Sequence, residues 1–173
     1  SQRQKWIDYG GFVEKFKPKL TTDDCYTPEA IYNAIRDWVV DEYGVDASKF
    51  VRPFWPGGDY ENYDYPEGCV VVDNPPFSIL SEIVCFYIAA GIKFFLFAPA
   101  MTVFNTICGK KCCVLCAHGE IRYENGARVP TSFITNLESP GVRSAPELYK
   151  RIREANAANK QKVSLPKYKY PDE

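Results

Sequence analysis

A short segment in the middle of the chain, Asp73-Asn74-Pro75-Pro76-Phe77, contains the residue types needed for an amine-binding slot. Two successive prolines restrict the backbone and remove two N–H donors, which leaves carbonyl oxygens available as acceptors. Asn74 adds a side-chain carbonyl, and Phe77 adds a ring that we expect to be exposed. Two acceptors and one stacking face suit a flat group that carries an NH₂, so this segment is the first candidate for a catalytic site.

Four cysteines and the single histidine form a second cluster within eleven residues: Cys108, Cys112, Cys113, Cys116 and His118. Cys113-x-x-Cys116 has the spacing of a zinc knuckle, but a closed zinc site takes four ligands, usually from two separated pairs. If this segment is a strand, Cys112 and Cys116 face one side and Cys113 faces the other. Buried thiols often replace small apolar residues. We therefore expect core cysteines and no tightly bound metal.

The elements around the first candidate indicate a buried parallel sheet. Residues 69–73 (CVVVD) are four apolar residues running into an acid, which is typical of a strand covered on both faces. Residues 78–91 then predict a helix that stops at Gly91, and Lys93–Pro99 predicts a second buried strand, giving a βαβ unit. Ligands of such sheets bind beyond the carboxyl ends of the strands, where Asp73 lies.

The remaining segments complete an α/β class with a mixed sheet. We expect an amphipathic helix capped by Thr27, with Pro28 as its first residue and its end near Gly44. A short strand at 49–53 and a loop from Phe54 to Gly68 follow. Asn125-Gly126 predicts a hairpin in an antiparallel edge of the sheet. Residues 144–147 have the pattern of a capping box, which predicts a helix reaching about residue 159.

Asn74-Pro75-Pro76-Phe77 after an apolar strand resembles the catalytic motif of amino methyltransferases that use S-adenosylmethionine. By this resemblance, the Asn74 side chain and the Pro75 carbonyl accept hydrogen bonds from the target amine. Phe77 stacks on a flipped-out base, and Pro76 and Ser78 also contact the substrate. The fold implied is a Rossmann-like class I methyltransferase sheet, mostly parallel with an antiparallel C-terminal hairpin.

Two further segments carry the same resemblance, in the same order along residues 24–138. Tyr26-Thr27-Pro28 is similar to the cofactor-contacting N-terminal motif of these enzymes, and residues 118–137 resemble the late hairpin of the phage-type DNA N6-adenine methyltransferases. The implied activity is methyl transfer from S-adenosylmethionine to adenine in DNA. The residues implied to bind the cofactor are Tyr26, Thr27, Pro28, Phe54, Gly57, Gly58, Asp59 and Asp73.

The glycine motif departs from the family pattern, because it is present only as Phe54-Trp55-Pro56-Gly57-Gly58. The residues from Phe54 to Gly68 are too few for the two further strands that normally hold the adenosine, so we expect a compact sheet that lacks strands. Asp59, Glu61 or Asp64 is then the source of a carboxylate for the ribose hydroxyls. The alternative interpretation is a surface loop in a catalytically inactive relative.

Composition and charge narrow the function classes. The chain has 173 residues, of which 46% are hydrophobic and 25% charged, so it is not disordered, collagenous or a coiled coil. Seven cysteines and no apolar leader favour a reducing cytoplasm, in a bacterial host or phage-infected cell, and no apolar stretch is long enough to suggest a membrane partner. Residues 1–20 and 142–173 are basic around an acidic centre, which could hold phosphates.

The expected organisation is a basic N-terminal segment (1–23), a methyltransferase-like domain (24–159) and a basic tail (160–173). A separate target-recognition domain would need longer insertions than the sequence contains. Specificity then depends on short loops, the termini or a second subunit, which leaves a homodimer open. Three alternatives to a DNA methyltransferase also stay open: an RNA adenine methyltransferase, a protein glutamine methyltransferase, and an inactive module of this fold that binds nucleic acid.

Overall fold

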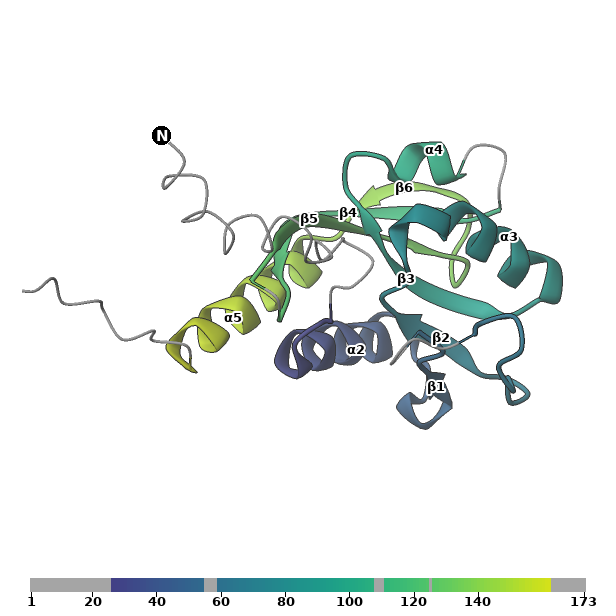
Figure 1. The fold of residues 1–173 in the computed structure, drawn as a ribbon, viewed down its shortest axis with the longest axis horizontal. Helices are drawn as coiled ribbons and strands as arrows, with labels where there is room; N and C mark the ends of the chain where they lie inside the picture. Colours follow the sequence, from purple (N-terminus) through teal and green to yellow (C-terminus); the bar gives the residue numbers. More distant parts are fainter. Residues whose placement is uncertain (1–25, 55–58, 108–110, 125, 163–173) are drawn as a thin grey trace, which may run out of the picture.

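The computed structural model describes residues 26–54, 59–107, 111–124 and 126–162, and within them the chain is an α/β protein with one six-stranded mixed sheet (Figure 1). Four α-helices and two 3₁₀ turns accompany the sheet in these residues. The strands are β1 (Phe50–Val51), β2 (Val70–Asp73), β3 (Lys93–Pro99), β4 (Cys113–Arg122), β5 (Arg128–Thr135) and β6 (Gly141–Ser144). The helices are α2 (Glu29–Tyr43), α3 (Leu80–Ala90), α4 (Val103–Ile107) and α5 (Pro146–Lys162), with 3₁₀ turns η3 (Ala47–Lys49) and η4 (Phe77–Ile79).

The strand order is β1-β2-β3-β5-β4-β6, and β5 is antiparallel to both of its neighbours while the other pairs are parallel. Every described strand except β5 therefore ends at the same edge of the sheet, which we call the carboxyl edge. The expected hairpin of β4 and β5 is present, but neither of its strands is the outermost strand of the sheet. Phe133 and Ile134 of β5 are both fully buried, on opposite faces. A strand buried on both faces is stable inside a sheet, and β6, which the sequence did not reveal, forms the edge instead.

Helices cover both faces of the sheet (Figure 1). On one face, α2 and α5 pack against a core that includes Val70 and Val72 of β2. On the other face, α3 and α4 pack against a core that includes Val71. None of the helices in the described residues is both long and apolar enough to cross a membrane.

Helix α2 forms as the apolar spacing predicts, because Ile31, Ile35 and Trp38 recur on its buried face. It ends at Gly44, which has φ 64° and donates its N–H to the Val40 carbonyl at 2.9 Å. The expected Thr27 cap is wrong by one residue. Pro28 holds the cap position with extended backbone angles and without a side-chain capping bond, so the helix begins at Glu29.

Strand β4 shows the alternation that was expected of the cysteine segment. Cys112, Val114 and Cys116 pack on the α3 side, and Leu115 and Ala117 pack on the α2 side. Cys112 and Cys113 are each 2% exposed, so these thiols are core side chains. Cys108 lies outside the described residues, as do Gly57, Gly58, the segment 1–23 and residues 163–173.

Candidate functional site

The carboxylate of Asp73, at the end of β2, holds together two loops that leave the carboxyl edge side by side. It is 2% exposed. Its Oδ2 accepts the Phe54 N–H at 2.9 Å, and its Oδ1 accepts the Asn74 N–H at 2.9 Å and the Arg52 Nε–H at 3.4 Å. Strands β1 and β2 are adjacent and parallel, which brings residues 52–54 next to residues 73–74. Asp73 therefore sets the starting position of the Asn74-Pro75-Pro76-Phe77 segment.

Burial raises the pKa of Asp73 to about 6, against the lowering effects of the Arg52 guanidinium and the two backbone N–H groups. The Arg52 guanidinium also lies 3.7 Å from the centre of the Tyr32 ring, a cation–π contact. The Tyr32 hydroxyl in turn donates to the Val72 carbonyl at 2.9 Å. Arg52 and Tyr32 thus join α2 to the end of β2. The sequence analysis singled out neither Arg52 nor Tyr32. Only the position of Tyr32 beside the apolar residues of α2 could have suggested that it is buried.

The Asn74 segment passes from the core to the surface over five residues. Pro75 is buried, Asn74, Pro76 and Phe77 are half-buried, and Ser78 is exposed. The Phe77 ring packs against the core on the α2 side, so the expectation of an exposed ring holds only in part. An apolar ring this close to the sheet loses contact with water when it covers the core beside α2. Its remaining exposed surface is the part available for a stacking partner.

The residues before α2 lie at the same edge. The Tyr26 carbonyl accepts the N–H of Glu124, just past the end of β4, at 3.0 Å, while its side chain is 44% exposed. Thr27 is 3% exposed, and its hydroxyl oxygen has no hydrogen-bond partner within the described residues. A buried hydroxyl without a partner is costly, and a polar ligand would satisfy it. Pro28 is also buried.

Asp59 lies in the exposed part of the loop between β1 and β2. Its carboxylate accepts the Glu61 N–H at 3.1 Å and the Asn62 side-chain amide at 2.6 Å, and these hydrogen bonds lower its pKa. The loop itself is anchored, because Tyr60 and Tyr65 pack against the core on the α3 side. Binding of cofactor by Asp59, Gly57 and Gly58 stays a prediction.

Known proteins offer no template for this arrangement. The chain matches no protein-family model, no curated protein and no solved structure. Among the described residues, no group of three or more His, Cys, Asp or Glu side chains is arranged to hold a metal ion.

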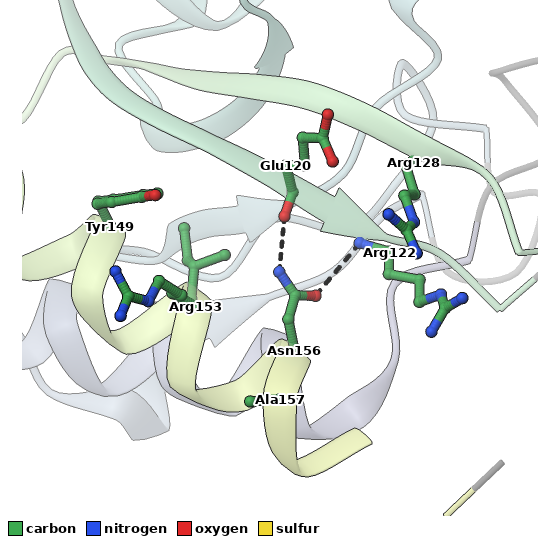
Figure 2. Close-up of a pocket in the computed structure, with 8 residues that line it drawn as sticks. Glu120, Arg122, Arg128, Tyr149, Arg153, Asn156 and Ala157 are labelled. Atoms are coloured by element: carbon green, nitrogen blue, oxygen red, sulfur yellow. Dashed lines mark hydrogen bonds between the residues drawn. The ribbon is translucent and has the colours of Figure 1, made fainter. Parts of the chain in front are cut away.

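A pocket of about 580 Å³ opens between α5 and the β4–β5 hairpin (Figure 2). Asn156 of α5 is one of its lining residues and forms two hydrogen bonds to the backbone of β4, donating to the Glu120 carbonyl at 2.6 Å and accepting the Arg122 N–H at 3.3 Å. The residues lining the pocket are Glu120, Arg122, Arg128, Tyr149, Ile152, Arg153, Asn156 and Ala157.

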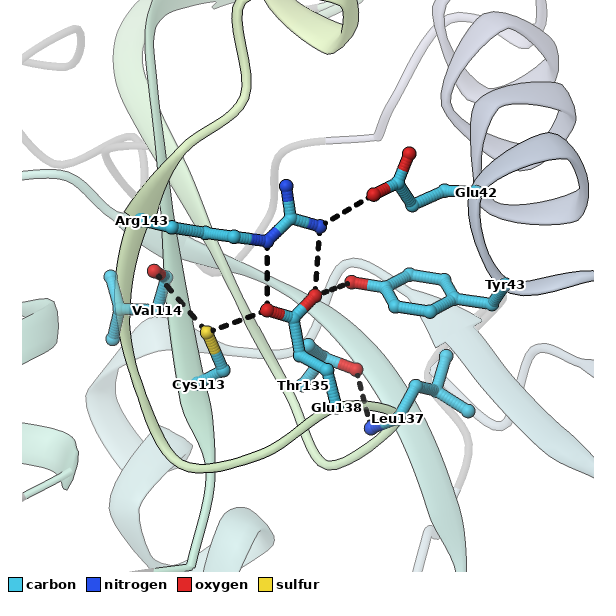
Figure 3. A network of polar contacts seen from close by, with 8 residues as sticks. All are labelled: Glu42, Tyr43, Cys113, Val114, Thr135, Leu137, Glu138 and Arg143. Carbon is cyan, nitrogen blue, oxygen red and sulfur yellow. Dashed lines mark hydrogen bonds and ion pairs between the residues drawn. The ribbon is translucent and has the colours of Figure 1, made fainter.

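A polar cluster around Glu138 lies at the other edge of the sheet, where β4 begins and α2 ends (Figure 3). Glu138 accepts from Arg143 at 2.7 and 2.8 Å, from the Tyr43 hydroxyl at 2.6 Å and from the Cys113 thiol at 3.1 Å. These hydrogen bonds, chiefly those from Arg143, lower the pKa of Glu138 to about 2. Its position away from Asp73 makes this cluster a structural connection between α2, β4 and β6.

Proposed function

We propose that the chain is an S-adenosylmethionine-dependent methyltransferase that acts on the N6 amine of adenine in DNA. The observation that carries this proposal is the segment Asn74–Phe77, which leaves a fully buried strand at the carboxyl edge with its start held by Asp73. Open α/β sheets bind their ligands at this edge. The strand order supports the class I methyltransferase fold, because the late hairpin places one antiparallel strand, β5, among parallel ones.

The residues at this edge fit the cofactor in one specific respect. Thr27 presents a buried hydroxyl without a partner in the described residues, and it precedes the helix whose Tyr32 contacts β2. Thr27, Tyr26, Pro28 and Phe54 would hold S-adenosylmethionine, which supplies an electrophilic methyl group on sulfur when bound. Both oxygens of Asp73 already accept hydrogen bonds from the chain, so we assign Asp73 the role of positioning Asn74.

The chemistry asked of Asn74 and Pro75 is orientation of a weak nucleophile. The lone pair of an aromatic amine is delocalised into its ring, and two acceptors that hold the N–H bonds favour a more tetrahedral nitrogen with its lone pair directed at the methyl group. The new N–C bond would form as the bond between the methyl group and sulfur breaks, the electron pair would stay on sulfur as a neutral thioether, and the amine would release one proton to solvent. The half-buried Phe77 ring offers its exposed face to the base.

The test is methyl transfer by the Asn74→Ala variant. Losing a positioned acceptor should lower turnover by about 10²–10³-fold while S-adenosylmethionine still binds by calorimetry. Asn74→Asp keeps an oxygen acceptor and should retain more activity than the alanine variant. Asn33→Ala removes the same amide from α2 and serves as the matched control, with circular dichroism and unfolding compared for all variants. Near-normal turnover by a folded Asn74→Ala variant would contradict the proposal.

Assays with three substrates distinguish the DNA methyltransferase from the RNA and protein methyltransferase alternatives. Labelled methyl transfer is measured with duplex DNA, with RNA and with a glutamine-containing peptide. Transfer only to RNA or only to peptide would keep the chemistry and replace the substrate. Calorimetry that detects no S-adenosylmethionine binding by the folded full-length chain would indicate the inactive module, and the enzyme proposal would then be wrong.

A further inference from the structure

The arginines that line the pocket between α5 and the β4–β5 hairpin differ from the other arginines of the described structure in their ion pairing (Figure 2). Seven arginines lie in the described residues. Four of them form ion pairs with carboxylates: Arg36 with Asp37, Arg52 with Asp73, Arg143 with Glu138 and Glu42, and Arg151 with Asp41. The three that form no ion pair within the described residues, Arg122, Arg128 and Arg153, all line this pocket.

The pocket keeps an excess of positive charge although it contains one acid. Glu120 lies on its wall and is exposed, but it forms no ion pair with these arginines in the described structure. Arg122 and Arg128 are opposite each other on β4 and β5, and Arg153 approaches from α5. Like charges in one concave site repel one another, so an anion that enters lowers the electrostatic energy of all three.

Two features of the backbone build the pocket. The Asn156 side chain pairs with the free edge of β4 beyond the end of β6, which holds α5 against Glu120 and Arg122. Gly119 has no side chain, and a Cβ there would lie 2.9 Å from the Tyr149 ring, so glycine allows Tyr149 to pack directly on the strand. The arginines are therefore presented by fixed elements, which reduces the entropy lost when they bind a ligand.

The pocket also adjoins the candidate site. Arg122 is the last residue of β4, and two residues later the Glu124 N–H binds the Tyr26 carbonyl at 3.0 Å. The guanidinium group matches phosphate oxygens through paired hydrogen bonds, and arginine is well suited to phosphate recognition for that reason. A volume of about 580 Å³ is within the range of small-ligand sites.

We propose that Arg122, Arg128 and Arg153 bind a backbone phosphate of a nucleic acid. The inference rests on the proposed function only in taking the substrate to be a nucleic acid, since it requires no methyl transfer. The contacts hold the strand through its phosphates, independent of base sequence, beside the edge at which Asn74 lies.

The experiment measures binding of the full-length chain to a short fluorescent DNA duplex by anisotropy over a salt series. The Arg122→Gln/Arg153→Gln variant removes two positive charges from the pocket, both from arginines without an ion pair in the described residues. The Arg36→Gln/Arg151→Gln variant removes the same charge from arginines that pair with Asp37 and Asp41. Each lost phosphate contact should lower affinity by roughly 5- to 10-fold near 0.1 M salt and reduce the salt slope by about 0.9. The pocket variant should show twice this reduction in slope, and the control should show little change.

Three outcomes would overturn the inference. The first is equal weakening in the two variants, which would indicate only the general charge of the chain. The second is unchanged DNA and RNA binding by the pocket variant. The third is loss of inorganic phosphate or nucleotide binding with nucleic acid binding intact, which would assign the pocket to a free anion. Arg128→Gln, on the exposed start of β5, repeats the test if the double variant fails to fold.

Methyl transfer separates this inference from the proposed function. If the pocket variants bind DNA normally and methyl transfer is also normal, the inference is wrong and the proposed function stands. If no variant and no wild-type sample transfers methyl groups but DNA binding depends on the pocket arginines, the inference stands without the enzyme.

Discussion

Replacement of Glu138 by glutamine tests the polar cluster that joins α2, β4 and β6 (Figure 3). The variant keeps the shape of the side chain and one acceptor oxygen. It removes the negative charge and places an NH₂ group where an oxygen now accepts a hydrogen bond from Arg143, at 2.7 or 2.8 Å. Arg143 then keeps one hydrogen bond to residue 138 and its ion pair with Glu42, and one of the Tyr43 and Cys113 donors loses its acceptor.

The expected loss follows from the pKa of Glu138, which falls from 4.5 to about 2 in the folded chain. Because the folded pKa is depressed, the ionised form stabilises the fold. This stability is fully present above the unfolded pKa near 4.5 and is lost as the pH falls through about 2. A shift of this size corresponds to about 3 kcal/mol, and partial exposure of both partners reduces the expectation to about 2 kcal/mol.

The assay is urea unfolding of the wild-type chain and Glu138→Gln from about pH 7 to about pH 3. The difference in unfolding free energy should be about 2 kcal/mol near neutral pH and should shrink once the pH falls below the unfolded pKa of a glutamate. Glu42→Gln is the matched control, because Glu42 is 40% exposed and makes a single contact with Arg143. Its cost should stay below about 1 kcal/mol.

Three results would refute this reasoning. One is a difference smaller than about 0.5 kcal/mol near neutral pH, the size of an exposed ion pair. Another is a difference that does not change between neutral and acidic pH, since the cost would then come from shape and not from charge. The third is an equal cost for Glu42→Gln, which would assign the stability to Arg143 in general.

Two further variants test the buried carboxyl of Asp73 and the packing of Gly119 against α5. Asp73→Asn removes a carboxyl whose folded pKa, about 6, lies above its ordinary 3.8. Wild-type stability relative to the variant should therefore be highest below the unfolded pKa, fall by up to about 3 kcal/mol as the pH rises from the unfolded to the folded pKa, and level off above it. A difference in urea unfolding that does not change with pH would contradict this. Gly119→Ala should cost about 1–2 kcal/mol because its Cβ meets the Tyr149 ring, and the cost should vanish in a Tyr149→Ala background; an equal cost in both backgrounds would assign it to the backbone.

Local patterns predicted most of the secondary structure. The strand Lys93–Pro99 has the bounds that its apolar composition indicated, and α3 and α2 stop at the glycines that were expected to end them. These elements are predictable because burial periodicity and glycine stops act over a few residues. Thr27 was misread as a cap because Pro28 can itself hold the cap position in an extended conformation.

The place of the late hairpin and the existence of β6 could not be read from the sequence in this way. Asn125-Gly126 predicted the hairpin, but the position of β5 between β3 and β4 depends on pairings between residues far apart in the chain. Gly141–Ser144 is short and mostly exposed, so it lacks the apolar alternation of a strand. Its pairing with β4 is a tertiary contact.

The sequence alone determined that Asn74 follows a buried strand, since a run of valines before an acid and two prolines allows few other structures. Only the tertiary structure decided what surrounds that residue. The hydrogen bonds of Asp73 to Phe54 and Arg52 join residues that are 19 and 21 positions apart in the chain. The α5 pocket gathers Arg122, Arg128 and Arg153 from two strands and a helix, and these residues come together only when those elements pack side by side. Burial, charge compensation and pKa depend on distance in space, and distance along the chain does not specify them.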